Sequence, residues 1–144
     1  MSKFSVERNC QSTECFSTMS FSAVTQQQSR SAVLSKAVLN AAEILGISNS
    51  RLAKILGVSP ATITRLGGGA YQLSEGKKEW EFGVLLVRLF RSLDSIAGGD
   101  NELAARWMQS GNRAFAGRKP LELVETAEGL VRVVSYLDAS RGIV

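Results

Sequence analysis

Six residues near the middle of the chain have the types and spacing needed to contact DNA bases and phosphates. They are Ser59, Pro60, Ala61, Thr62, Thr64 and Arg65. An arginine can donate two hydrogen bonds to the major-groove edge of a guanine, and a threonine can offer its hydroxyl or its methyl group. The other side chains are short or lack a donor. Discrimination between sequences would therefore depend on Arg65, on threonine contacts and on DNA shape.

These residues need a helix that presents them to the major groove, and residues 49–66 have the pattern of a helix-turn-helix. Ser48 can cap the first helix, and Gly57 supplies the positive φ needed where the chain leaves it. Ser59 and Pro60 are typical of the start of the second helix. The residues expected to hold the two helices together are Leu52, Ala53, Leu56, Gly57, Val58, Ile63 and Leu66. A plain helical hairpin is the alternative.

The charge of the chain is unevenly distributed along its 144 residues, which together carry +4. Residues 30–93 hold nine lysines and arginines against four acidic residues. Residues 1–29 are balanced, and residues 94–144 have one more acidic than basic residue. The basic excess therefore coincides with the helix-turn-helix, as expected of a segment that meets phosphates. Solvated surface lysines would give the same balance.

The composition argues against several functions. The chain has no histidine, which removes the commonest general base, the usual nitrogen ligand of zinc and every His-containing triad. No pair of carboxylates stands out, so we expect no catalytic residue, no cofactor and no enzyme. Cys10 and Cys15 cannot complete a four-ligand zinc site, so we expect free thiols and no metal. No apolar run approaches the roughly 20 residues of a membrane span, and no secretory signal is present, which predicts a cytoplasmic protein without membrane contact.

The pattern of apolar residues divides the chain into three regions and predicts an all-α fold, with no strand signal. Residues 1–29 are rich in Ser, Thr and Gln and predict a disordered or loosely docked leader, or a fusion or alternative-start segment. Residues 30–97 would form the DNA-binding domain, with a helix from about Ser31 and a long connecting helix from about Ser74 to Ile96. Residues 98–144 would form a small helical domain.

Further expectations concern single positions in these helices. The helix after Ser31 has a wide apolar face that includes Val33, and the short helix after residue 100 should turn Leu103 inward. Glycines 67–69 should end the second helix of the motif; a phosphate-cradling loop is the alternative, but no strand precedes it. The long helix has a second apolar stripe, so it should be covered on more than one side, as a spine or as a dimer contact. This stripe consists of Trp80, Val84 and Val87.

The C-terminal third contains six short motifs in a fixed order. They are Ala105-Arg106-Trp107-Met108, Asn112-Arg113-Ala114-Phe115, Gly117, Pro120-Leu121-Glu122-Leu123, Thr126-Ala127-Glu128-Gly129 and the closing Leu137 with Arg141-Gly142. In order and spacing these motifs resemble the toxin-binding domain of the Xre/MbcA/ParS antitoxins. The resemblance covers about Ser31 to Val144, with the helix-turn-helix included, and leaves residues 1–29 unmatched.

This resemblance implies an antitoxin of a bacterial type II toxin–antitoxin system whose partner is a RES-domain toxin, an enzyme that consumes NAD. In the family the antitoxin dimerises, its basic half binds the promoter of its own operon, and its extreme C-terminus reaches toward the toxin's NAD pocket. The segment that would block the toxin here consists of Tyr136, Leu137, Ser140, Arg141, Gly142, Ile143 and Val144. Arg141 could pair with a carboxylate, and Ile143 with Val144 could fill an apolar slot.

Two alternatives remain at the level of the sequence. The C-terminal segment could be an ordinary helix ending, with Gly142 as the cap. The whole chain could also be a free-standing helix-turn-helix repressor whose C-terminal domain serves only dimerisation. In either case a homodimer that bridges two half-sites would strengthen DNA binding, because each recognition helix has few strong base readers.

Overall fold

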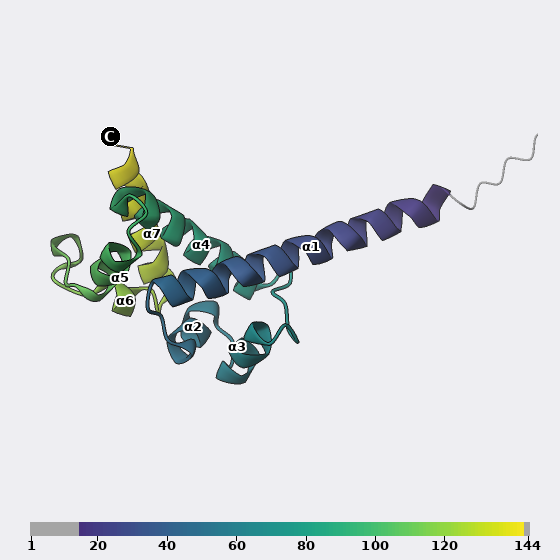
Figure 1. The fold of residues 1–144 in the computed structure, drawn as a ribbon, viewed down its shortest axis with the longest axis horizontal. Helices are drawn as coiled ribbons and strands as arrows, with labels where there is room; N and C mark the ends of the chain where they lie inside the picture. The colour runs from purple at the N-terminus through teal and green to yellow at the C-terminus, as the bar shows by residue number, and fades with distance from the viewer. Residues whose placement is uncertain (1–14, 143–144) are drawn as a thin grey trace, which may run out of the picture.

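The computed structural model describes the backbone of residues 15–142 and the side chains of residues 30–142. These residues contain helices and no strand, which confirms the predicted all-α fold. Figure 1 shows α1 crossing the molecule, with α2 and α3 on one side of it and α4 and α7 on the other. The elements are α1 (Cys15–Ile44), α2 (Asn49–Leu56), α3 (Pro60–Gly67), α4 (Lys78–Ala97), α5 (Asn101–Gln109), the 3₁₀ helix η1 (Arg113–Phe115), α6 (Pro120–Leu123) and α7 (Ala127–Arg141).

Helix α1 begins at Cys15, well before the start expected from the sequence. The sequence predicted a disordered or loosely docked leader. Residues 15–29 are helical and continue α1, in place of the disordered alternative, while residues 1–14 lie outside the described residues. Figure 1 shows this N-terminal part of α1 projecting away from the other helices. The apolar face of α1 is also narrower than predicted: Val38 and Leu45 are fully buried, whereas Val33 is 65% exposed.

Helix α4 lies at the centre of the fold. It packs against α1, α2, α5 and α7, so it is covered on more than one side as predicted. It starts at Lys78, later than expected, because Gly76 forms a turn with φ of 83°. A Cβ at Gly83 would lie 3.1 Å from Leu73 Cδ1 and 3.2 Å from Val38 Cγ2, so glycine lets α1 approach closely. One continuous apolar core runs from the helix-turn-helix to the C-terminal helices.

The connection from α3 to α4 is fastened at two points. The backbone N–H of Leu73 donates to the buried Ser35 hydroxyl at 3.0 Å, and that hydroxyl donates to Ser31 O at 2.7 Å. The Tyr71 hydroxyl donates to the Glu79 carboxylate. This bond, together with burial and the nearby negative charge, raises the pKa of Tyr71 to about 12. The segment that follows α3 is thereby tied to α4 and to α1.

Helices α5 and α7 pack on α4, and α6 packs on α5 and α7. In α5 the buried residues are Ala104 and Met108, while Leu103 is 46% exposed, so its predicted inward position is wrong. Helix α7 starts beside the end of α6. A Cβ at Gly129 would lie 2.0 Å from Leu123 O, closer than any side chain permits. Glycine at this position therefore sets the approach of α7 to α6.

Candidate functional site

Helix α3 presents the predicted DNA-contacting face to solvent. Ile63 and Leu66 are buried against the rest of the fold, and Thr62 is half-buried. The remaining predicted contact residues are exposed, and they are Ser59, Pro60, Ala61, Thr64 and Arg65. The structure therefore brings five of the six residues to one accessible surface. The turn before α3 has the expected form, since Gly57 has φ of 69°.

The hydroxyl groups of this face are partly engaged within the helix itself. Ser59 Oγ accepts from the backbone N–H of Thr62 at 3.2 Å and lies 2.9 Å from the Thr62 hydroxyl. The Thr64 hydroxyl donates its proton to Pro60 O at 3.2 Å, so its lone pairs and its methyl group remain for a partner. Arg65 forms no ion pair with the described residues. It is therefore the strongest donor on this face.

Helix α2 connects the motif to the C-terminal helices. Ser48 caps it by accepting from the backbone N–H of Arg51 at 3.4 Å. Arg51 Nε lies 3.5 Å from Glu125 Oε1, and Lys54 Nζ lies 3.4 Å from Glu125 Oε2. Glu125 lies between α6 and α7, so one carboxylate links the helix-turn-helix to the C-terminal region.

An aromatic cluster lies where α5, η1 and α7 meet. Trp107 and Tyr136 are stacked, with ring centroids 6.4 Å apart, and Phe115 meets Tyr136 edge-on at 5.2 Å. The Arg132 guanidinium lies 5.9 Å from the centre of the Phe115 ring, within range of a cation–π contact. Tyr136 is 37% exposed and Trp107 is half-buried. The cluster both packs the C-terminal helices and leaves an aromatic surface open.

The residues expected to block a toxin do not form one surface. Tyr136 lies in the aromatic cluster, and the Ser140 hydroxyl donates to its backbone oxygen at 2.9 Å. Leu137 is 1% exposed, so its predicted contact with a partner is wrong: it faces the core because it shares the buried side of α7. Arg141 extends toward α4 instead of toward the aromatic cluster. Ile143 and Val144 lie outside the described residues.

Arg141 belongs to a polar network between α4 and α7. Its Nη1 donates to Ser92 Oγ at 3.2 Å, and the Ser92 hydroxyl donates to Asp138 Oδ1 at 2.8 Å. Arg88 Nη2 lies 2.6 Å from Asp138 Oδ2. The hydrogen bond from Ser92, followed by the hydrogen bond and charge of Arg88, lowers the pKa of Asp138. The network holds the side chains of Arg88 and Arg141 in place.

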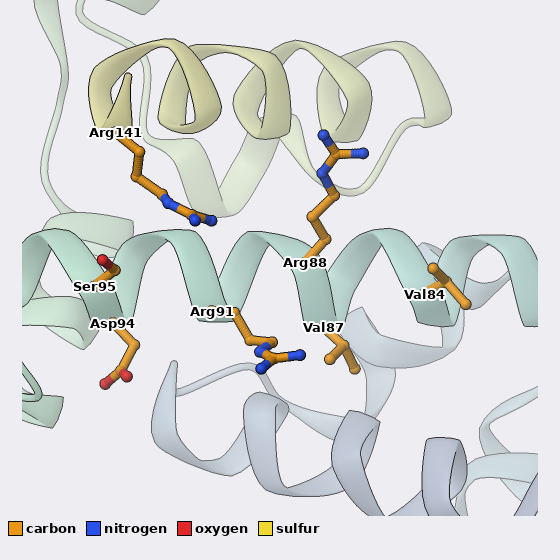
Figure 2. A pocket seen from close by; sticks show the side chains of 7 residues that line it. All are labelled: Val84, Val87, Arg88, Arg91, Asp94, Ser95 and Arg141. Carbon is orange, nitrogen blue, oxygen red and sulfur yellow. The ribbon is translucent and has the colours of Figure 1, made fainter. Parts of the chain in front are cut away.

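A groove of about 620 Å³ lies along the exposed side of α4 (Figure 2) and includes this network's two arginines. We call it the arginine groove. Its lining residues are Val84, Val87, Arg88, Arg91, Asp94, Ser95 and Arg141. From the sequence, Arg141 was expected in the segment that blocks the toxin, and Val84 and Val87 were expected in an apolar stripe covered as a spine or as a dimer contact. The signal for the others was the regular spacing of exposed positions on α4, where Arg88 and Arg91 interrupt the apolar pattern of Val84 and Val87.

Comparison with known proteins finds a domain family for each half of the chain. Residues 25–88 match the model of the antitoxin Xre-like helix-turn-helix domain, and residues 92–142 match that of the antitoxin Xre/MbcA/ParS C-terminal toxin-binding domain. The chain belongs to the Xre/MbcA/ParS family of antitoxins. One chain in the crystal structure of the Mycobacterium tuberculosis MbcT-MbcA toxin–antitoxin complex is 28% identical to this antitoxin. That likeness covers 78% of this chain and 97% of that chain, with a TM-score of 0.57.

A second similarity is short. This antitoxin is 46% identical over 39 residues to the 6-hydroxy-3-succinoylpyridine 3-monooxygenase HspA of Pseudomonas putida. The match covers 27% of this chain and only 12% of the monooxygenase. A stretch of that length carries no activity from one protein to the other.

The site residues lie in different parts of the two matched ranges, and one of them lies in neither range. Helix α3 lies within the helix-turn-helix match, and Arg141 lies near the end of the toxin-binding match. Arg91 lies between the two matches, so the arginine groove crosses the boundary between them. Within residues 30–142 no three acidic or cysteine side chains are placed to hold a metal ion, and no helix there could span a membrane.

Proposed function

We propose that this antitoxin neutralises a RES-domain toxin that consumes NAD, by placing its C-terminal segment in the toxin's NAD pocket. The observation that carries the proposal is the match of residues 92–142 to the family's toxin-binding domain. The toxin partner is supported by the likeness to a chain of the MbcT-MbcA complex. The RES fold and the use of NAD follow from the family resemblance.

The end of α7 has chemistry that suits this role. Arg141 is exposed, and its guanidinium can form charge-assisted hydrogen bonds with a carboxylate. Tyr136 and Ser140 lie on another side of α7, where Tyr136 offers an aromatic surface of the kind enriched at protein interfaces. Ile143 and Val144, which follow Arg141 in the chain, would enter the apolar part of the pocket, while the Arg141 side chain remains turned toward α4. Leu137 would hold α7 in place from within the core.

We further propose that α3 binds operator DNA, so that the antitoxin represses its own operon and has no catalytic activity of its own. Arg65 would make the strongest base contact, with Thr64 and the Ser59–Thr62 turn beside it. A homodimer would place two α3 helices in successive major grooves and would supply the affinity that one such helix lacks.

The two proposed partners need not compete for space. Figure 1 shows the C-terminal end of α7 and helix α3 on opposite sides of α1. A toxin held at the end of α7 would therefore leave the outward face of α3 accessible. This arrangement allows one antitoxin to hold toxin and DNA at the same time.

The proposal is tested by co-expression with the neighbouring reading frame of the operon. We expect a stable complex when the antitoxin is purified through a tag, and a fall in cellular NAD only when the antitoxin is omitted. Deletion of residues 143–144 should abolish neutralisation and leave DNA binding intact. If the shortened antitoxin still neutralises the toxin, the proposal that its C-terminal segment inserts into the NAD pocket is overturned. If nothing co-purifies and NAD is unchanged, the repressor alternative replaces the proposal.

A further inference from the structure

The arginine groove follows one stripe of α4. Val84, Arg88, Arg91 and Ser95 are all exposed and are separated by four, three and four residues, which places them on one side of the helix. Figure 2 shows Arg141 reaching toward α4 from α7, while the Arg91 side chain extends from α4 in the direction away from α7. The groove therefore has guanidinium groups along both of its sides and apolar side chains at one end.

The arginines of the groove differ in how fully they are neutralised. Arg88 is paired with Asp138, whereas Arg141 donates to the neutral Ser92 hydroxyl. Arg91 forms no ion pair with any residue that the structure describes. Three arginines thus face two carboxylates, those of Asp94 and Asp138. The groove keeps a positive charge that an anionic partner can neutralise.

The position of the groove argues against DNA as that partner. Arg141 closes the groove at the end of α7, and Figure 1 shows that end remote from α3. A duplex seated on α3 would not reach it. Valines at one end also suit a peptide, which has apolar side chains, better than a bare phosphate. A second copy of the chain is disfavoured because a two-fold contact would place the positive groove against itself.

We propose that the arginine groove is a second anchor for the toxin and that it takes an acidic peptide segment of that protein. Carboxylates of this segment pair with Arg91 and Arg141, and a neighbouring apolar side chain packs on Val84 and Val87. The inference rests on the proposed function, since the occupant is the same toxin. It extends the toxin contact to Val84, Val87 and Arg91, in the part of α4 that precedes residues 92–142, which match the toxin-binding domain.

The test measures binding of the purified toxin to the full antitoxin by titration calorimetry at several salt concentrations. We expect Arg91→Glu to weaken binding by about tenfold or more, and we expect the loss to shrink as salt rises. Lys36→Glu is the matched control, because this exposed lysine on α1 lies outside the groove and its reversal changes the net charge equally. Arg91→Lys should retain most of the affinity, and circular dichroism should show unchanged helix content for all variants.

The outcomes separate the inference from the proposed function. Failure of the unmodified antitoxin to bind toxin would overturn both. Normal toxin binding by Arg91→Glu would overturn only the inference, as would an equal loss of operator binding or a loss of dimer in light scattering. Reversal of one acidic residue of the toxin to lysine should restore binding to Arg91→Glu. If each acidic residue on the toxin surface is reversed in turn and none restores binding, the proposal that the groove takes an acidic segment is refuted.

Discussion

The helix-turn-helix is shaped by hydrogen bonds between residues close in the sequence, whereas the arginine groove is shaped by hydrogen bonds between residues far apart in the sequence. In the helix-turn-helix, Ser48 bonds to Arg51 and Ser59 bonds to Thr62, each three residues away. In the groove, Ser92 bonds to Asp138 and Arg141 bonds back to Ser92, across 46 and 49 residues. The exposed face of α3 is therefore shaped within the two helices of the motif, whereas the groove exists only when α4 and α7 are docked.

The difference affects how each region can be altered. A substitution on α3 changes one side chain on a face that its own helix supports. A substitution between α6, α7 and α4 changes how whole helices approach one another. We therefore expect the largest losses of stability in the C-terminal region and the cleanest losses of binding on α3.

Gly129→Ala should have the largest effect. The new Cβ would lie 2.0 Å from Leu123 O, and a backbone carbonyl cannot move away as a flexible side chain can. We expect the free energy of unfolding in urea to fall by about 3 kcal/mol. Gly67→Ala is the control, because nothing lies within 4 Å of its Cβ and its backbone is helical. An equal loss in both variants would contradict the close approach of α7 to α6.

Arg65→Ala should weaken operator binding by about 2 kcal/mol, the size of one good base contact. Its side chain is exposed and forms no ion pair with the described residues, so the fold and toxin binding should be unchanged. A mobility-shift titration at fixed salt measures the loss, with Lys36→Ala as a control for a general charge effect. Equal affinity for Arg65→Ala and the unmodified antitoxin would argue against α3 as the reading helix.

The sequence predicted the local features of the fold well. Ser48, Gly57 and Ser59 cap or end helices as their types indicate. Each of these signals depends on a few neighbouring residues, so it can be recognised from the sequence alone. The start of α1 was missed because the prediction relied on an apolar stripe, and the polar residues 15–29 lack a clear one. The helix nevertheless continues through them.

The arginine groove could not be predicted from local patterns. An apolar stripe predicts that one side of α4 is buried. It does not predict which helix packs on that side or at which residue the burial ends. Val84 was counted with the apolar stripe, yet it is 44% exposed. Likewise, Leu137 and Arg141 are one helical turn apart, and the depth of the core under α7 decides that the first is buried and the second reaches Ser92.

Asp138→Asn tests the contact that keeps Arg88 in the groove. It removes the carboxylate beside Arg88 and should lower the free energy of unfolding at pH 7 by about 1 kcal/mol. Folding lowers the pKa of Asp138, so its charge stabilises the fold above the unfolded pKa of about 3.9, and this contribution is lost as the pH falls through the folded pKa. Urea unfolding at pH 7, 5 and 3 should show a constant difference between the proteins at the first two values and a smaller one at pH 3. A difference that persists undiminished well below pH 3 would contradict the role of the carboxylate charge.

Glu125→Gln should have the smallest effect and tests the link between the two regions. Both ion pairs, to Arg51 and to Lys54, are partly exposed, so we expect a loss of only about 0.5 kcal/mol in the free energy of unfolding. Because salt screens exposed pairs, the loss should vanish in about 1 M NaCl. Glu122→Gln on α6 is the matched control, since Glu122 is exposed and forms no ion pair with the described residues. A larger loss that resists salt would mean that the helix-turn-helix depends on a distant contact after all, and the contrast between the two regions would then be one of degree.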